Sequence, residues 1–373
     1  MKLDARAYSS RPARDLPAAE FQARVTRLLA YQKSQYLDAV FLFTAVNRYY
    51  FTGLATSSGL LLTRNGAGPA FYTDFRYLTM AKRGAPWLPC RTLWRPADEQ
   101  AALAKLGQGW RRIGYEGQLD AATFLRMKAA LPQAEWVDVG RPVAELRAVK
   151  SRAEQRAVRA AVAANDRLIA AVLKEVKPGI SEREISTLVR READRLGQGE
   201  AFDTIACVGR NGAECHHHPD MTVLKRGQPL LLDLGLKLDH YCSDLTRCVF
   251  FGTPSPLYRE LHTIVLEANL KAVRAIKPGE LCCDIDAVAR THIEKAGYGA
   301  HFGHSLGHAV GLEIHESPGF SSSCRTVLKP GMVLTVEPGI YLPGKTGIRI
   351  EDMVLVTRTG CEVLSQTPRW MTA

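Results

Sequence analysis

The segment LKRGQPLLLDLG at residues 224–235 recurs as LKPGMVLTVEPG at residues 328–339. Each copy reads Leu-Lys, a bend with glycine, an apolar run and then an acid, which is Asp233 in the first copy and Glu337 in the second. A short apolar run that follows turn residues is typical of a buried strand. The repeat therefore predicts two related strands, each of which ends in a carboxylate.

The segments upstream of these strands predict helices, and they repeat as well. VKPGISEREISTLVRREADRLG (176–197) has a counterpart in IKPGELCCDIDAVARTHIEKAGYG (276–299). Capping-box patterns at Ser151 and Ser181 each indicate the start of a helix. A repeat of about 100 residues is too long for a solenoid unit. It predicts one domain made of two related halves, each a pair of helices followed by strands.

The first part of the chain has a different organisation. Residues 1–145 alternate between helix-like segments, such as 18–35 and 121–131, and short strand-like runs, such as 38–44. A chain of 373 residues is long for a single core. We therefore expect the fold class α/β (α+β), with a small α/β domain at 1–145 and a pseudo-twofold domain at 151–373.

Composition excludes several functions. The net charge is +11, but no block of five like charges occurs, so we expect no nucleic-acid partner. No apolar stretch approaches the roughly 20 residues of a membrane helix, so we expect no membrane partner. The N-terminal MKLDARAYSSRPARDLP lacks the apolar segment of a signal peptide. From these two observations we expect a cytoplasmic protein. Nine cysteines occur without a CxxC pair, which indicates reduced, mostly buried thiols.

Four acids point to a metal centre. Asp233 and Glu337 end apolar strands, and Asp244 in HYCSDLTRCVF and Glu351 in GIRIEDMVLV follow them in a second strand-like context. If the two halves pack about a pseudo-twofold axis, four carboxylates converge, and buried carboxylates repel one another unless they are protonated or neutralised. Nearby arginines, Arg247 and Arg349, could pair with two of the acids at most. Two divalent cations would balance the four charges.

Histidines supply a further ligand. All ten lie between residues 216 and 315, and the first 215 residues contain none. Within HFGHSLGHAVGLEIHESPG (301–319), His308 stands between Gly307 and Gly311, which allow a close approach of backbone and ligand. Oxygen ligands with one nitrogen favour manganese, cobalt or iron over a structural zinc site.

This set of motifs resembles the pita-bread metallopeptidases. The spacing Asp233-x10-Asp244, then GHAVGLEIHE, VEPGIY and GIRIED, is similar to the proline-specific branch, aminopeptidase P and Xaa-Pro dipeptidase (prolidase). TDFRYL (73–78) and LRAVKS (146–151) resemble the creatinase/prolidase-like N-terminal domain and linker of that branch, so the resemblance covers most of the chain.

The resemblance implies roles for individual residues. Asp233 and Asp244 would bind one metal ion, His308 and Glu337 the other, and Asp244 and Glu351 would bridge the two. Glu337 would also accept the proton of the attacking water, in a hydrolysis by a metal-bridging hydroxide. The metals would be two divalent ions, manganese first, with cobalt, iron or zinc as alternatives.

Other residues would act on the substrate. His315 would steady the tetrahedral intermediate and His216 would stand on the other side of the substrate, so the catalytic residues are His216, His315 and Glu337. His304, Tyr341 and Arg349 match substrate-side positions. The chain departs from the branch at Cys215, where proline is usual, and at Ser305-Leu306 and Ala309, positions that bear on substrate preference rather than on metal binding. His217 and His218 have no motif role, and we expect both to be exposed.

The implied activity is hydrolysis of the bond before a proline in the second position of a short peptide, as an Xaa-Pro aminopeptidase or an Xaa-Pro dipeptidase. The sequence does not choose between these two. Alternatives are a relative that hydrolyses a non-peptide amide and a non-catalytic pita-bread binding protein, although such binding proteins typically lose ligands. Methionine aminopeptidase shares the catalytic domain without needing the N-terminal one. The family also implies a homodimer.

Overall fold

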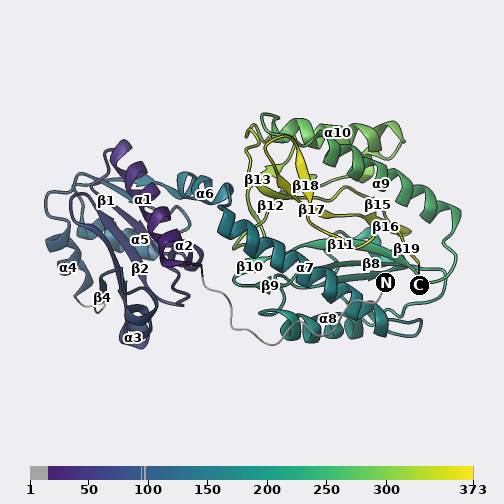
Figure 1. Ribbon diagram of the computed structural model, residues 1–373, viewed down its shortest axis with the longest axis horizontal. Coiled ribbons are helices and arrows are strands. Elements are labelled where there is room, and N and C mark those ends of the chain that lie inside the picture. The colour runs from purple at the N-terminus through teal and green to yellow at the C-terminus, as the bar shows by residue number, and fades with distance from the viewer. Residues whose placement is uncertain (1–15, 94, 96–97, 373) are drawn as a thin grey trace. The chain divides into compact units, whose positions relative to one another are not determined.

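The computed structural model describes residues 16–93, 95 and 98–372, and the chain divides into two compact units with a boundary between Arg147 and Ala148 (Figure 1). The segment 1–15, for which the sequence predicts no signal peptide, lies outside the described residues. Within the described ranges, no helix is both long and apolar enough to cross a bilayer.

The N-terminal unit contains a six-stranded mixed sheet in the order β4-β3-β2-β1-β5-β6. Its strands are β1 (Ala39–Leu42), β2 (Leu60–Arg64), β3 (Gly68–Thr73), β4 (Cys90–Thr92), β5 (Arg112–Tyr115) and β6 (Glu135–Asp138). Its helices are α1 (Ala18–Ser34), α2 (Ala45–Thr52), α3 (Phe75–Gly84), α4 (Glu99–Leu106), α5 (Ala121–Ala130) and α6 (Gly140–Ala148). Strand β1 is antiparallel to β2 and parallel to β5, and both faces of it are buried. The α/β alternation predicted for this part is confirmed.

The first half of the C-terminal unit is a helix pair followed by a sheet in the order β19-β11-β8-β7, in which β8 is antiparallel to both β7 and β11 and β19 runs parallel to β11. Its elements are α7 (Arg152–Glu175), α8 (Glu182–Leu196), β7 (Ile205–Val208), the 3-10 helix η1 (Gly209–Ala213), β8 (Pro229–Leu234), β9 (Lys237–Leu238), β10 (Tyr241–Cys242) and β11 (Leu245–Phe250). The short strands β9 and β10 pair with each other.

The second half repeats this plan with a sheet in the order β13-β12-β14-β17-β18. Its elements are α9 (Pro256–Ala275), α10 (Cys282–Lys295), the 3-10 helix η2 (Gly299–His301), β12 (Gly307–Ala309), β13 (Glu316–Phe320), β14 (Val333–Val336), β15 (Gly339–Leu342), β16 (Thr346–Arg349), β17 (Asp352–Val356), β18 (Cys361–Val363) and β19 (Met371–Thr372), the last of which joins the sheet of the first half. In Figure 1 the two helix pairs lie on opposite outer sides of the strands. The predicted pair of related halves is confirmed.

Two apolar clusters hold the C-terminal unit together. One joins α7 and α8 to β8, and the other joins α9 and α10 to β14 and β17 and also includes Leu231 of β8 and Phe250 of β11, so it spans both halves. Both predicted capping boxes form: Ser151 with Glu154 at the start of α7, and Ser181 with Glu184 at the start of α8.

A buried asparagine ties each helix pair to the strand that ends in an acid. Asn165 of α7 donates its side-chain amide to the carbonyl of Leu234 at 3.1 Å. Asn269 of α9, 104 residues later, donates to the carbonyl of Val336 at 2.9 Å. Because a buried carbonyl without a donor is costly, the two contacts fix the ends of β8 and β14 against the helices. These strand ends carry the acids of the site.

The halves also approach each other closely at two glycines. A Cβ on Gly347 in β16 would overlap the carbonyl oxygen of Gly212 in η1, and a backbone atom cannot move aside as a flexible side chain can. We therefore expect Gly347→Ala to lower the free energy of unfolding by at least about 2 kcal/mol. Thermal unfolding of the purified variant measures this. Gly303→Ala is the matched control, since a Cβ added there would meet no atom within 4 Å, and equal loss in both variants would contradict the close contact.

Candidate metal centre

The four predicted acids lie where the strands of the two halves end. Asp233 is the penultimate residue of β8 and Asp244 directly precedes β11, which pairs with β8. Glu337 directly follows β14 and Glu351 directly precedes β17, which pairs with β14. The backbone N–H of Glu351 donates to the carbonyl of Thr246 at 3.1 Å, so the two sheets meet at this point. The pseudo-twofold arrangement thus brings the acid-bearing strand ends together.

His308 lies among these acids. Its Nε2 is 3.4 Å from Oε1 of Glu337 and 3.6 Å from Oδ2 of Asp244. The ligand atoms of Asp244, His308 and Glu351 all lie within 4.8 Å of one another, which is the spacing of groups that can share an ion. His308 stands on β12, held by the backbone N–H that it donates to the hydroxyl of Thr335 at 3.0 Å.

Burial makes the ionised form of this cluster unfavourable. Asp244 is 5% exposed and Glu351 1%. Burial, together with the charges of the neighbouring acids, holds the pKa of both carboxyls well above its usual range. Burial also raises the pKa of Glu337 to about 7, with Arg349 opposing and Asp233 adding to the shift. The acids therefore require protons or cations beside them.

The pKa of His308 moves in the direction that suits a ligand. Burial, with some repulsion from His315, lowers its pKa to about 4. The ring is therefore neutral near pH 7, and neutral imidazole is the form that binds a metal ion.

Arg349 offsets one of the four charges. Its Nη2 donates to Oδ2 of Asp233 at 2.6 Å, its Nη1 to the hydroxyl of Tyr341 at 2.9 Å, and its Nε to Thr246 at 3.1 Å. Arg247, the other arginine considered from the sequence, pairs instead with Asp352 at 2.9 Å. One arginine cannot balance four carboxylates.

Two buried oxygen atoms of the cluster show whether divalent cations fit among these residues. Oδ1 of Asp233 and Oε1 of Glu351 are buried and have no hydrogen-bond partner among the described residues. A buried carboxylate oxygen without a donor is costly, and a divalent cation satisfies it as a hydrogen bond would. Carboxylate oxygens with one imidazole nitrogen suit a hard or borderline divalent ion. The residues present fit such ions.

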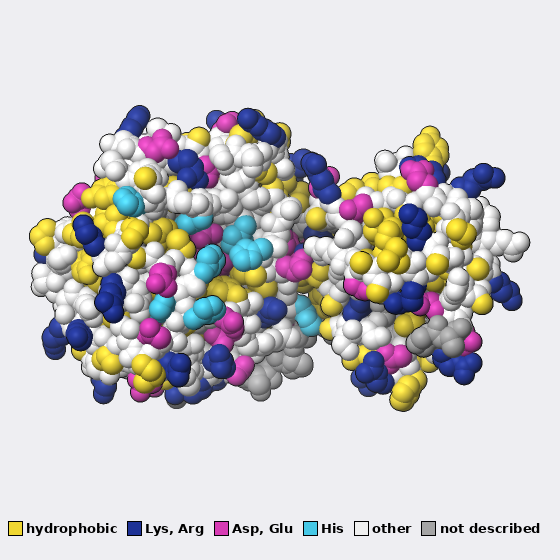
Figure 2. All heavy atoms as spheres, turned by 180° about the vertical axis from the view of Figure 1, so that it is seen from behind, with side chains coloured by type: hydrophobic (Ala, Val, Ile, Leu, Met, Phe, Trp, Pro, Cys, Tyr) yellow, Lys and Arg dark blue, Asp and Glu magenta, His cyan; other side chains and the backbone are white. Residues whose placement is uncertain are grey.

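The remaining predicted residues lie around this cluster. The rings of His315 and His308 are 4.4 Å apart and nearly perpendicular. Nε2 of His304 is 2.9 Å from the hydroxyl of Tyr341, and burial, together with the charges of Arg349, Arg290 and His216, lowers the pKa of His304 to about 4. His216 and His315 are exposed, as groups that meet a substrate must be. Figure 2 shows histidine and acidic side chains gathered in a hollow on one face of the C-terminal unit.

Sequence reasoning missed two threonines that orient the acids. The hydroxyl of Thr246 donates to Oε2 of Glu351 at 2.8 Å, and that of Thr335 donates to Oε1 of Glu337 at 3.2 Å. The strand period could have identified them, because Thr246 is two residues from Asp244 and Thr335 two residues from Glu337, and residues two apart in a strand share a face.

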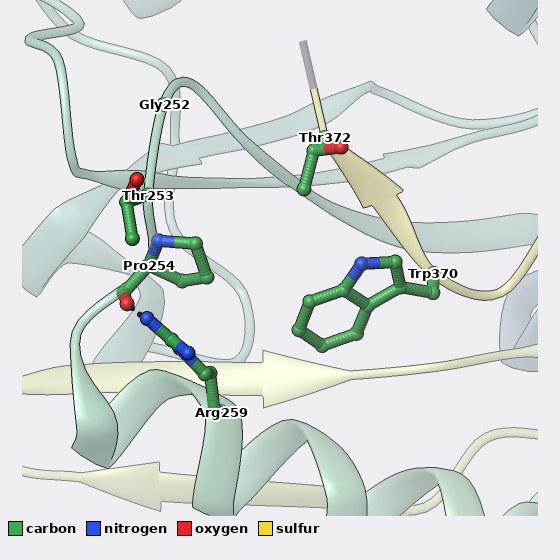
Figure 3. Close-up of a pocket in the computed structure, with 6 residues that line it drawn as sticks. All are labelled: Gly252, Thr253, Pro254, Arg259, Trp370 and Thr372. Carbon is green, nitrogen blue, oxygen red and sulfur yellow. Dashed lines mark hydrogen bonds between the residues drawn. The ribbon is translucent and has the colours of Figure 1, made fainter.

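A pocket elsewhere in the C-terminal unit takes no part in this site. It has a volume of about 440 Å³ and is lined by Gly252, Thr253, Pro254, Arg259, Trp370 and Thr372 (Figure 3). Nε of Arg259 donates to the carbonyl of Pro254 at 3.0 Å, and the Trp370 ring packs against His262 and Phe250. None of the predicted site residues is among its lining residues.

Two segments of the chain match described families. Residues 156–358 match metallopeptidase family M24, and residues 24–149 match the creatinase/prolidase N-terminal domain. An Xaa-Pro dipeptidase of Pyrococcus furiosus is 36% identical over 347 residues, which cover 93% of this chain and 98% of that protein.

Solved structures agree with these matches. The Xaa-Pro dipeptidase from Bacillus anthracis superposes with a TM-score of 0.89 at 33% identity, over 95% of this chain and 100% of that one. The X-Pro aminopeptidase from Thermotoga maritima superposes with a TM-score of 0.85 at 32% identity, over 94% and 99%. The similarity therefore extends over both units of the chain.

Proposed function

Because the chain belongs to metallopeptidase family M24, we propose that it hydrolyses the peptide bond between an N-terminal residue and a proline in the second position. It is a metallo-exopeptidase. Relatives that are 36% and 33% identical over nearly their whole length are named Xaa-Pro dipeptidases, which supports proline as the second residue of the substrate.

One observation supports the proposal most strongly: buried carboxylates from both halves converge beside a neutral histidine, and two of their oxygens lack hydrogen-bond partners among the described residues. A binding protein gains nothing from such a costly cluster, whereas a metallo-hydrolase needs it. The residues that would hold the two divalent cations are Asp233, Asp244, His308, Glu337 and Glu351. Bound there, the ions would polarise the scissile carbonyl and make a water molecule acidic near neutral pH.

The side chains around the ions have separate tasks in this proposal. Glu337 accepts the proton of the attacking water, and its hydrogen bond from Thr335 keeps the carboxylate in place. His315, exposed beside His308, donates an N–H to the carbonyl oxygen as negative charge develops there. His216 stands on the other side of the substrate.

A second set of residues would line the substrate side of the metal centre. His304 and Tyr341 are hydrogen-bonded to each other, and Arg349 donates a hydrogen bond to the Tyr341 hydroxyl, so the three side chains are held as one unit. Because Arg349 also donates a hydrogen bond to Asp233, it links these substrate-side residues to the proposed metal ligands. Manganese, a homodimer and a cytoplasmic location remain predictions of the sequence.

A panel of three peptides tests the function. With added Mn²⁺, we expect hydrolysis of Ala-Pro or of Ala-Pro-Gly and at most trace hydrolysis of Ala-Ala, measured as release of free alanine. Cleavage of Ala-Pro alone assigns a dipeptidase, and cleavage of Ala-Pro-Gly assigns an aminopeptidase. Ala-Ala hydrolysed as fast as either proline peptide would overturn the proposed specificity, and a chelator that leaves the rate unchanged would overturn the metal requirement.

A further inference from the structure

The residue that follows His216 is anchored in the protein. The His217 side chain is 10% exposed, whereas His216 and His218 on either side of it are exposed, so the predicted exposure is wrong for His217 and confirmed for His218. Nε2 of His217 lies 2.8 Å from Oε2 of Glu182, and Nδ1 lies 3.2 Å from Oε2 of Glu214. A ring with a carboxylate oxygen at each nitrogen donates to both only as the imidazolium.

The charges around His217 favour that form. Burial by itself lowers the pKa of His217, but the hydrogen bonds to Glu182 and Glu214 and the charges of Glu182 and Asp220 outweigh it, so the pKa is raised. Glu182 is fully buried and Glu214 is 73% exposed. The ion pair of His217 with Glu182 is therefore stronger than its pair with Glu214, since solvent screens the buried pair less.

Glu182 connects His217 to the surrounding backbone. Its Oε1 accepts from the N–H of Val208 at 2.6 Å and from the side-chain amide of Asn211 at 3.0 Å, and its Oε2 also accepts from the N–H of Asp220 at 3.1 Å. The start of α8, the end of β7 and both ends of the segment 209–222 thus meet at one carboxylate.

A metal ion is the other occupant to consider at this point. The ligand atoms of Glu182, His217 and Asp220 are close enough to hold one. Each oxygen of Glu182, however, already accepts two hydrogen bonds, whereas the buried oxygens Oδ1 of Asp233 and Oε1 of Glu351 accept none from the described residues. The ion pair with His217 and the other hydrogen bonds therefore satisfy the buried Glu182 carboxylate without a metal ion.

The segment 209–222 is held on its other side by the second half of the domain. Gly212 contacts the backbone of Gly347, and Nη1 of Arg349 lies 3.5 Å from the carbonyl oxygen of Cys215. Cys215 directly precedes His216, so this contact lies beside the proposed substrate-side histidine. His216 therefore stands on a segment fixed from two directions.

The other substrate-side histidine has a similar neighbour. Glu316, which follows His315, lies 2.9 Å from Nζ of Lys150, and the two side chains are 4% and 1% exposed. Its Oε1 also accepts from the N–H groups of Leu312 and Glu313 at 3.2 and 3.4 Å. In each half, the residue after the proposed substrate-side histidine forms an ion pair with a nearly fully buried partner.

We propose that His217 is a positioning residue, whose ion pair with Glu182 holds His216 against the substrate. The proposal rests on the proposed Xaa-Pro peptidase function, because the role of His216 belongs to that function. Without the ion pair, the segment keeps its fold but His216 is no longer held in one place, and a displacement of about 1 Å near the reacting groups can cost a hundredfold in rate.

Steady-state kinetics of four variants test the proposal. We expect His217→Gln to lower kcat for the best proline peptide by roughly 10- to 100-fold. His218→Gln, the same change one residue away on an exposed side chain, should stay within about twofold. The double variant His216→Ala/His217→Gln should be about as active as His216→Ala alone, because a positioning residue has no effect once its target is gone. Effects that multiply in the double variant, or equal rates for His217→Gln and His218→Gln, would overturn the proposal.

A spectroscopic measurement is independent of turnover. In ¹⁵N-histidine NMR spectra of the full chain, His217 should carry protons on both ring nitrogens at pH 6, and His217→Gln should shift the ring signals of His216 while His218→Gln does not. Unchanged His216 signals in His217→Gln would refute the positioning role. If wild-type protein cleaves no proline peptide but these shifts occur, the proposed function fails and the positioning of His216 stands.

Discussion

Asp244→Asn is expected to lower kcat/KM for the proposed proline substrate by roughly a thousandfold or more, since the loss of a proposed metal ligand would remove several kcal/mol of transition-state stabilisation. Asp244 lies 3.6 Å from His308, and the charges of Glu351, Asp233 and Glu337 all raise its pKa. The amide keeps the size of the carboxylate but removes its charge. Metal content, measured by mass spectrometry, should fall with the activity.

The same variant should be more stable than the wild type when both are free of metal. A buried carboxyl with a raised pKa costs stability at pH 8, because folding must either bury its charge or bind a proton, and the amide avoids both, so the melting temperature of metal-free Asp244→Asn at pH 8 should exceed that of the metal-free wild type. Asp203→Asn, the same change at an exposed position, is the control for both measurements. A variant that retains a tenth of the activity, or that loses stability, would count against the metal centre.

The second large effect concerns pH and metal removal. Glu337 has a folded-state pKa of about 7 against an ordinary value of 4.5, and burial also holds the pKa values of Asp244 and Glu351 well above their usual range. Between pH 4.5 and about pH 7, the folded metal-free protein binds more protons at Glu337 than the unfolded chain does, so the free energy of unfolding falls as pH rises. Below pH 4.5 this loss is absent. Above pH 7 it is complete for Glu337, at about 3 kcal/mol.

Divalent cations should cancel this loss by compensating the charges. Melting temperatures of chelator-treated protein, with and without Mn²⁺, should differ by more at pH 8 than at pH 5.5, by several degrees. Glu337→Gln should flatten the pH dependence of the metal-free protein, because the amide does not titrate. Metal-free protein that gains stability from pH 5.5 to 8 would show that these carboxyls do not carry raised pKa values.

The fold could be predicted where the information is local. An apolar run that ends in an acid, found twice in LKRGQPLLLDLG and LKPGMVLTVEPG, specifies two strands, and the serines at 151 and 181 specify two helix starts. Helix α2 (Ala45–Thr52) was not predicted. Its start depends on the fully buried carboxylate of Glu116, which accepts from Thr44 and Asn47, about 70 residues away in the chain.

The residues of the site divide in the same way, into those that local sequence indicates and those that depend on contacts between distant segments. The sequence indicated the acids and His308, because a charge at the end of a buried strand requires compensation wherever the strand lies. It could not indicate that His217 is paired, because Glu182 is 35 residues away, nor that Glu316 meets Lys150, 166 residues away. Nothing in the neighbourhood HHH distinguishes the middle histidine from the last.

The sequence alone thus determined that this protein has two related halves with carboxylates at matching strand ends, since apolar periodicity and unpaired charge act within a few residues. Only the tertiary structure decided which of these groups meet, which arginine faces Asp233 and which histidine is anchored. The physical reason is that burial and hydrogen bonding depend on distances in space, and residues far apart in the chain become neighbours only when the halves close on each other.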